Sequence, residues 1–290
     1  MSPSRRIALF LPIFVAATAA SIWGADPAPD TITVPAQAVV TTKVTATVTK
    51  NGEAVQEIRE VPVKIQKEIT LNPKTCAVVI CDMWDNHWCE AAAKRCDVLA
   101  KKAGPVVDAA RKSGMTIVHC PSDCMGYYAG HPARKRTQAV KVTPPPPAKD
   151  LPNPPLPIDD SDGGCDDAGP SKQFRAWKKQ HDAVAIDADK DYITDNGKEV
   201  YSVLADRGTK TVIVMGVHTN MCVLHRTFAI KQLRKWDVDC LLVRDLTDAM
   251  YNPKMKPFVT HDAGTNLVID YIERYWCPTI ESTALLAGKK

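Results

Sequence analysis

A cysteine stands where a short apolar strand turns into a helix, a setting in which a thiol can act as a nucleophile. The run 211–215 is β-branched and predicts a buried strand, Gly216 allows a tight turn, and Cys222 begins a helix-like run that continues over 223–230. Backbone N–H groups at a helix start favour a thiolate and can bind an oxyanion. The alternative is that Cys222 packs against the sheet, as buried cysteines commonly do.

A carboxylate is expected beside this thiol, although the two are far apart in the sequence. Residues 76–81 form a second apolar run that predicts a buried parallel strand, and Asp82 follows it directly. Strands that alternate with helices predict a parallel sheet covered on both faces, and ligands bind such sheets at the carboxyl ends of the strands. Asp82 and the turn before Cys222 both fall at that edge. A carboxylate there can accept a thiol proton and return it to a leaving amine.

These two stretches resemble the isochorismatase-like cysteine hydrolases, a family that includes nicotinamidases and N-carbamoyl-amidohydrolases. The resemblance rests on the sequences AVVICDM at 77–83 and VIVMGVHTNMCV at 212–223, and it covers about residues 74–282. It implies an α/β fold with a doubly wound, mostly parallel sheet and helices on both faces. It also implies hydrolysis of a C–N bond in a small amide-like molecule, with Asp82 as acid and base and Cys222 as the residue that forms an acyl-enzyme.

The resemblance further implies an oxyanion site next to the thiol. The peptide bond between Val217 and His218 is expected to be cis, with the N–H groups of His218 and Cys222 aimed at the oxyanion. Trp84 and His87, just after Asp82 in the sequence, are expected to line the substrate pocket; the alternative is that they are packed loop residues. The substrate itself cannot be read from these residues, because specificity is carried by loops.

A third catalytic residue of the family is a lysine after the strand that precedes the 197–207 helix. Lys190 is the lysine of this chain in that region, but its neighbours do not match the family's pattern. The alternative is a surface lysine among aspartates. A cation is needed near Asp82 to keep that carboxylate ionised, and Arg134 and Arg136 are the other candidates.

A metal site has weaker support, so the expectation is a reaction without a cofactor. Some members of the family hold zinc with an aspartate and histidines after the second strand, which is expected here at 115–120. Asp123 and His131 follow that strand and are the two weak candidate zinc ligands, but Met125 stands where a third would be. The acidic stretch 159–167 lacks the final glutamate of an EF-hand loop and predicts a solvated surface turn.

The N-terminus predicts export. Residues 1–25 have the layout of a signal peptide, with Arg5 and Arg6 before an apolar run and small residues after it. We therefore expect a periplasmic or secreted protein with no stable membrane anchor after cleavage. In an oxidising compartment some of the nine cysteines other than Cys222 are expected to pair, although their connectivity cannot be deduced from the sequence.

The remaining sequence predicts the organisation of the chain. Residues 26–72 form a β-rich N-terminal extension, and residues 73–285 form the hydrolase-like domain, which a long Pro-rich loop over about 122–180 interrupts. Extended segments are expected in the extension at 31–34, 43–49 and 61–69. Further elements are expected in the domain: a helix at 88–113, strands at 183–186 and 239–243, a helix at 262–275 and an edge strand at 278–280.

Three classes of function fit these observations. The first is an exported cysteine hydrolase that acts on a small-molecule substrate. The second is a catalytically degenerate protein of the same fold that binds a ligand or has a structural role. The third, thiol–disulfide exchange, is disfavoured because no C-x-x-C pair begins a helix. A formal net charge of +4 over 290 residues, with no basic stripe interleaved with aromatics, excludes nucleic acid as a partner, and a homo-oligomer is left open.

Overall fold

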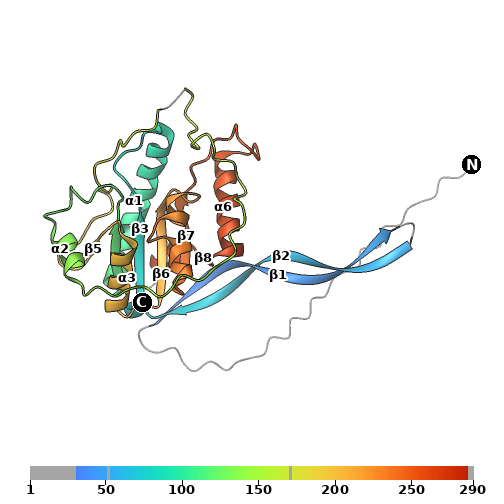
Figure 1. Cartoon of the computed structure of the whole chain (residues 1–290), viewed down its shortest axis with the longest axis horizontal. Coiled ribbons are helices and arrows are strands. Elements are labelled where there is room, and N and C mark those ends of the chain that lie inside the picture. The colour runs from blue at the N-terminus through green and yellow to red at the C-terminus, as the bar shows by residue number, and fades with distance from the viewer. Residues whose placement is uncertain (1–30, 51–52, 170–171, 287–290) are drawn as a thin grey trace, which may run out of the picture.

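The computed structural model describes residues 31–50, 53–169 and 172–286, which form a domain around an eight-stranded sheet (Figure 1). The order of the strands is β2-β1-β8-β7-β6-β3-β4-β5. Strands β3 to β8 run parallel to one another, whereas β1 pairs antiparallel with both β2 and β8. The strands are β1 (Ile32–Lys50), β2 (Glu53–Leu71), β3 (Cys76–Cys81), β4 (Thr116–Cys120), β5 (Tyr192–Ile193), β6 (Thr211–Val217), β7 (Asp239–Asp248) and β8 (Thr279–Ile280). The predicted fold class, a mostly parallel sheet with helices on both faces, is confirmed.

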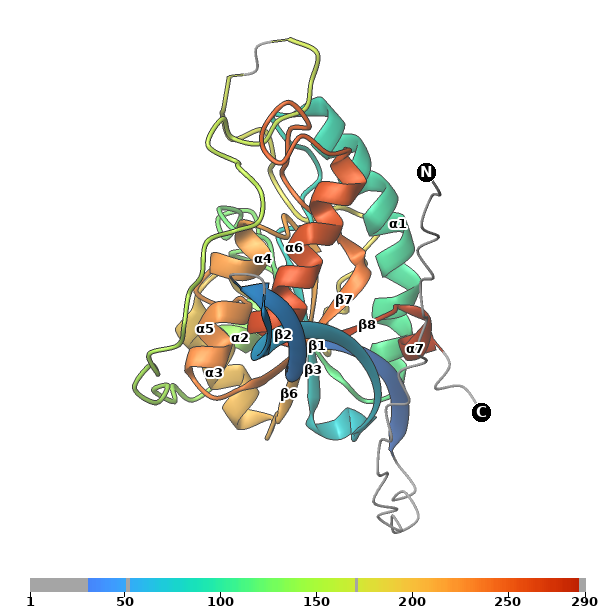
Figure 2. The ribbon, with the colours of Figure 1, turned by 90° about the vertical axis from the view of Figure 1, so that its right-hand side faces the viewer.

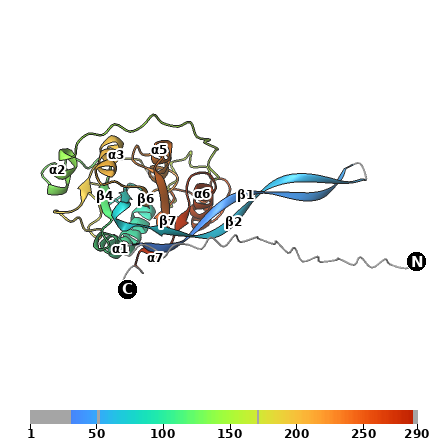
Figure 3. The same ribbon diagram turned by 90° about the horizontal axis from the view of Figure 1, so that it is seen from below.

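Helices cover the two faces of this sheet unequally. On one face lie α1 and α7, and on the other lie α3, α5 and α6 (Figures 2 and 3). The helices are α1 (Glu90–Lys112), α2 (Pro132–Ala139), α3 (Gly197–Asp206), α4 (Cys222–His225), α5 (Ile230–Lys235), α6 (His261–Tyr275) and α7 (Thr283–Leu286), with a 3-10 turn at Pro73–Thr75. Because both faces are covered, the central strands β3 and β6 are apolar almost throughout.

Two of the predicted strands differ from the structure. The strand predicted at 183–186 is wrong, because this segment is a turn in which the Val184 N–H donates to the His181 carbonyl and the Val184 carbonyl accepts from the Gln180 side chain. The strand that pairs with β4 is β5, only two residues long and later in the sequence. The predicted edge strand at 278–280 is not at an edge, since β8 lies between β7 and β1.

The N-terminal extension is a long β-ribbon. Strands β1 and β2, each of 19 residues, pair along their whole length. The sheet continues into the ribbon where Ala36 and Gln37 of β1 pair with β8. The extended segments predicted at 31–34, 43–49 and 61–69 lie within these two strands, except for Thr31, which precedes β1. Beyond its base the ribbon projects away from the domain (Figure 1).

The predicted signal peptide, residues 1–25, lies outside the described residues, so export stays a prediction. Among the helices that the structure does describe, none has the length and apolar character that a membrane crossing requires.

A buried carboxylate holds β5 against the rest of the domain. Asp191 Oδ2 lies 2.7 Å from an Arg111 guanidinium nitrogen on α1 and 2.9 Å from Nε2 of His119 on β4. Burial alone would raise the pKa of Asp191, but hydrogen bonds from His119 and Arg111 outweigh burial and hold it at about 2. The ionised carboxylate therefore joins α1 and β4 to the segment that leads into β5.

Replacement of this carboxylate is expected to destabilise the fold. In the Asp191→Asn variant the buried Arg111 cation loses its charge partner, which we expect to lower the free energy of unfolding by about 3–5 kcal/mol. Urea unfolding followed by circular dichroism measures this change. The matched control is Asp189→Asn, on an exposed side chain of the same turn, with an expected change within about 0.5 kcal/mol. Equal effects of the two substitutions would contradict the proposed role of Asp191.

Candidate active site

Two neighbouring parallel strands bring Asp82 and Cys222 together. Strands β3 and β6 pair so that Cys81 lies opposite Gly216, and each strand is followed at its carboxyl end by one of the two residues. Gly216 has φ 122° and lies so close to β3 that a Cβ there would meet the Cys81 carbonyl oxygen at 1.9 Å. Asp82 is fully buried, whereas Cys222 is partly exposed. The Cys222 thiol and the Asp82 carboxylate lie close enough for each to shift the pKa of the other.

The Asp82 carboxylate has two further partners. Its Oδ1 accepts a 2.7 Å hydrogen bond from the Ser122 N–H, at the end of β4. Its Oδ2 accepts a 2.9 Å hydrogen bond from Nε of Arg226. Burial raises the pKa of Asp82, and the Arg226 cation and the Ser122 N–H oppose this rise without cancelling it. The opposite charge that the sequence analysis required beside Asp82 is thus supplied by an arginine.

Lys190 is not the cation at this site, which corrects the prediction. Its side chain is exposed and pairs with Asp187 at 3.6 Å, in the turn before β5. The lysine was expected to follow a strand at 183–186. In the structure the strand before α3 is β5, and Lys190 lies before this strand and not after it. Arg134 pairs with a glutamate of α3, and Arg136 donates to backbone carbonyls, so neither contacts Asp82.

Arg226 is a site residue that the sequence analysis missed. It follows Cys222 by one helical turn, a spacing that places two side chains on the same side of a helix. This spacing was a usable signal, but the run over 223–230 was assigned to a single helix without functional residues. In the structure that run is divided, since α4 ends at His225 and α5 begins at Ile230. We refer to Asp82, Cys222 and Arg226 as the reactive cluster.

Cys222 is a neutral thiol at neutral pH. Burial raises the pKa of Cys222 above its usual range, and the neighbouring Asp82 charge raises it further. The Arg226 cation and the backbone of His218 beside the sulfur oppose this effect and are outweighed. The thiolate predicted from a helix start is therefore wrong for the resting protein, because α4 is only four residues long and a carboxylate lies beside the sulfur.

The loop that carries the thiol is held from several sides. The Val217–His218 peptide bond is cis, as the resemblance implies. The Asn220 side chain donates to Asp160 Oδ2 at 2.7 Å and accepts from the Met250 N–H at 2.8 Å. The segment 159–167 is thus not a solvated surface turn, as predicted, but a support for residues 218–222, which we call the thiol loop.

The same acidic segment is anchored to α1. Asp166 pairs with Arg95 of α1 at 2.8 Å, and the Asp167 carboxylate accepts hydrogen bonds of 2.9 Å from the first two N–H groups of that helix. A disulfide joins Cys89, just before α1, to Cys165. This pair is the one disulfide among the ten cysteines, all of which lie in the described residues.

Aromatic rings form one wall beside the reactive cluster. Trp84 and Trp177 stack with ring centroids 4.0 Å apart, and both indole N–H groups donate to the Ser122 carbonyl. His87 stacks on Trp177, and its ring lies 4.9 Å from that of His218. Burial lowers the pKa of His87 to about 4 and that of His218 to about 3. This wall is therefore uncharged at neutral pH.

The two weak zinc candidates are not brought together with a third ligand. Asp123 lies 3.7 Å from Arg226, and His131 accepts a hydrogen bond from the Ala133 N–H at the start of α2. The described residues hold one group spaced like metal ligands: Cys89, Cys165 and Asp167. Two members of that group form the disulfide. A reaction without a cofactor stays a prediction.

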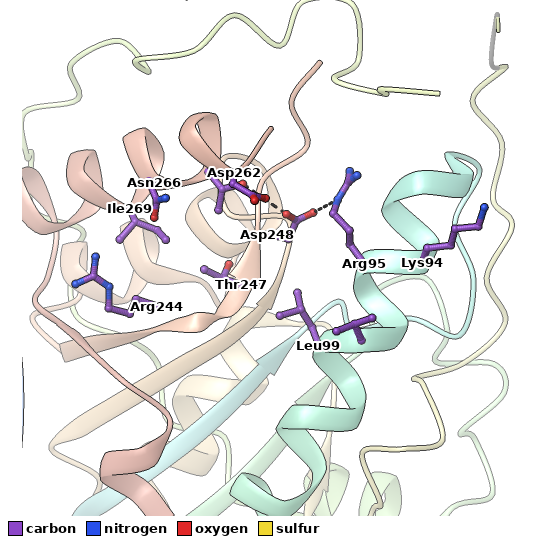
Figure 4. Close-up of a pocket in the computed structure, with 11 residues that line it drawn as sticks. Lys94, Arg95, Leu99, Arg244, Thr247, Asp248, Asp262, Asn266 and Ile269 are labelled. Atoms are coloured by element: carbon purple, nitrogen blue, oxygen red, sulfur yellow. Dashed lines mark hydrogen bonds and ion pairs between the residues drawn. The ribbon is translucent and has the colours of Figure 1, made fainter. Parts of the chain in front are cut away.

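A cavity of about 560 Å³ lies between α1 and α6, at the end of β7 (Figure 4). On its wall Arg95 Nε lies 2.8 Å from Asp248 Oδ2. None of the residues of the reactive cluster is among the described residues that line it. Thr247 on its wall is hydrogen bonded to Thr219 of the thiol loop at 2.8 Å. The cavity is therefore next to this loop but separate from the thiol.

The fold and the site together define an α/β protein with a cysteine, an aspartate and an arginine at the carboxyl edge of its sheet. Solved structures similar to it include a cysteine hydrolase from Pseudomonas syringae pv. phaseolicola, with 15% identity, TM-score 0.46 and coverage of 74% of this chain and 92% of that one. An isochorismatase from Pseudomonas putida has 14% identity, TM-score 0.43 and coverage of 73% and 90%. N-carbamoylsarcosine amidase from Thermoplasma acidophilum has 15% identity, TM-score 0.39 and coverage of 72% and 96%.

The names of these three proteins are those of isochorismatase-like cysteine hydrolases, the family that residues 77–83 and 212–223 of this chain resemble. No protein-family model matches the chain, and no curated protein matches it either.

The histidines of the aromatic wall are expected to stay neutral over the physiological range. Since burial lowers both pKa values, NMR titration should show no change of charge at His87 or His218 between pH 8 and pH 5. The variants His87→Gln and His218→Gln assign the two signals among the seven histidines. A midpoint near pH 6.5 for either ring would show that it is solvated rather than buried.

Proposed function

We propose that this protein is an exported cysteine hydrolase that cleaves the C–N bond of a small amide-like molecule. The observation that carries the proposal is the reactive cluster, in which one buried carboxylate is hydrogen bonded to the Arg226 cation and lies beside the Cys222 thiol. A carboxylate so placed can take the thiol proton, and the cation keeps it ionised until then.

The reaction proceeds in two halves. Asp82 accepts the proton of Cys222 as the sulfur bonds to the substrate carbonyl carbon, and the negative charge moves to the carbonyl oxygen. The N–H groups of His218 and Cys222 bind that oxygen. When the C–N bond breaks, protonated Asp82 gives its proton to the leaving amine. Water, deprotonated by Asp82, then releases the acyl group and returns the thiol.

Arg226 supplies the positive charge beside Asp82 that a lysine supplies in the family. It lies at hydrogen-bond distance from Asp82 and is close enough to Cys222 to lower the pKa of that thiol. The cation therefore stays near the negative charge wherever that charge lies along the path from carboxylate to sulfur. No cofactor takes part, and the neutral wall of Trp84, Trp177 and His87 favours an uncharged, planar substrate group.

A second candidate is a binding protein that has lost the chemistry. Two observations favour it: the family's lysine is missing from the site, and the pKa of Cys222 is raised. Such a protein would bind the amide without turnover, and substitution of Cys222 would leave its affinity unchanged.

Removal of the thiol tests the enzyme directly. With primary amides and N-carbamoyl compounds as trial substrates, Cys222→Ala is expected to lower kcat by about 1,000-fold or more, because no acyl-enzyme can form. The wild-type chain, quenched during turnover, should gain the mass of the acyl group at Cys222. Cys76→Ala, at the opposite end of β3, is the matched control and should keep wild-type turnover. A metal chelator in the assay should not change this result. Undiminished turnover by Cys222→Ala would exclude the nucleophile role.

The role of Arg226 is tested by the pH dependence of kcat/KM. Asp82 acts as a base only when ionised, so activity is lost as the pH falls through its raised pKa. Arg226→Met removes a charge that lowers this pKa, and we expect the acid limb to move to higher pH and kcat at neutral pH to fall about 100-fold. Arg226→Lys, which keeps the charge, should retain the wild-type limb. An acid limb that stays in place in the methionine variant would show that Arg226 does not act on Asp82.

A further inference from the structure

Two free cysteines lie opposite each other where β8 joins β7. The two strands pair in parallel so that Thr279 lies opposite Leu242. The Leu242 N–H donates to the carbonyl of Pro278 at 3.1 Å, so the chain already runs alongside β7 before β8 begins. Two residues earlier in each segment, the same register places Cys277 opposite Cys240. Both thiols are free in the structure.

The two thiols also lie on the same face of the sheet. Both cysteines pack in the part of the core that α5 and α6 cover. Neighbouring strands lie about 5 Å apart, and the Cα atoms of a disulfide are usually about 4.4–6.8 Å apart. Burial raises the pKa of Cys240, and the nearby Cys277 thiol raises it further. The register, the shared face and this mutual influence all place the two sulfurs near each other.

A cavity gives small molecules access to the two thiols. It has a volume of about 350 Å³, lies at the amino ends of β6 and β7, and is lined by Cys240, Cys277 and Arg234 of α5. Burial raises the pKa of Cys277 to about 12, and the Arg234 cation opposes the rise at both cysteines. A cation beside a thiol favours the thiolate, which is the form that attacks a disulfide.

A second pair of opposite cysteines provides a comparison. Cys81 of β3 lies opposite Cys120 of β4. Both are fully buried in the centre of the sheet, between strands that are covered on both faces. An oxidant therefore has no path to these two thiols, whereas the cavity opens onto Cys240 and Cys277.

We propose that Cys240 and Cys277 form a second disulfide of this protein, made by exchange with a small disulfide that enters the cavity. One cysteine thiolate attacks the oxidant, and a mixed disulfide forms as the first oxidant thiol leaves. The other cysteine then displaces the second oxidant thiol and completes the bond. The two cysteine sulfurs are oxidised, the oxidant is reduced to two thiols, and the two cysteine protons pass to those thiols.

The bond would secure the attachment of the ribbon. Strand β8 has only two residues, yet in the sheet it lies between β7 and β1 (Figure 1). Ala36 and Gln37 at the base of the ribbon pair with β8. A covalent link just before β8 therefore holds this short strand, and with it the base of the ribbon, on β7. The link lies at the end of the sheet opposite the reactive cluster and is independent of it.

Peptide mapping tests the pairing. The purified wild-type protein is incubated with 2-hydroxyethyl disulfide at about pH 8.5, where more of each thiol is ionised, and is then denatured, alkylated and digested without reduction. Mass spectrometry should find a peptide pair joined through Cys240 and Cys277, which separates on reduction. Absence of this pair, or a bond from either cysteine to another cysteine of the chain, would overturn the proposal.

Two variants show whether the register selects the partners. Cys120→Ala, which removes one member of the buried opposite pair, is the matched control and should keep the Cys240–Cys277 link. In Cys277→Ala the Cys240 peptide should instead carry the hydroxyethyl thiol of the mixed disulfide, because no second thiol displaces it. Loss of the link in Cys120→Ala would contradict the assigned pairing.

Hydrogen exchange tests the effect of the bond on the ribbon. Oxidation of the wild-type protein should slow exchange at the backbone amides of β8, Ala36 and Gln37 by about tenfold, because β8 then separates from β7 less often. Amides of β3 should be unchanged, and Cys277→Ala treated in the same way should show no slowing. Unchanged exchange at β8 in protein that contains the link would overturn the role given to the bond.

Discussion

A carboxylate buried at the end of β3 is costly unless its charge is partnered, and the site is arranged around this requirement. Asp82 is fully buried, and three groups from different parts of the chain converge on it: the Ser122 N–H after β4, the Arg226 guanidinium after α4 and the Cys222 thiol after β6. None of these groups could reach Asp82 without the parallel order of β4, β3 and β6, which places three strand ends side by side. The order of the strands therefore determines which loops contact the Asp82 carboxylate.

The long irregular segment between β4 and β5 has a structural role in the site. Trp177 from this segment stacks on Trp84, and both indoles are fixed by the same carbonyl. Asp160 holds the side chain of Asn220, two residues before Cys222, and the disulfide to Cys165 ties the segment to the start of α1. Much of the wall of the site and of the support of the thiol loop thus comes from residues outside regular secondary structure. Such contacts depend on partners that are distant in sequence.

The sequence was sufficient for the features that depend on local pattern. Buried strands before Asp82 and Cys222 were readable because long apolar runs bounded by glycine and polar residues have few alternatives. The position of β5 was not readable, since two residues carry no periodicity, and this error placed Lys190 on the wrong side of a strand. Arg226 was missed for a different reason. One turn of helix was enough to bring it to Asp82, but its role depends on a buried charge that only the packed sheet reveals.

An arginine in place of a lysine limits the routes that a proton can take. A guanidinium stays charged under all physiological conditions, and the Asp82 charge beside Arg226 raises the pKa of that guanidinium further. Arg226 therefore cannot receive the proton of Cys222, whereas a lysine in an apolar pocket can become neutral. Asp123, at 3.7 Å from the same guanidinium, lies toward solvent and shares its charge without reaching the thiol. In the proposed reaction the thiol proton therefore has one acceptor within the reactive cluster, Asp82, and the cation remains in place to stabilise whichever of the carboxylate and the sulfur is negative.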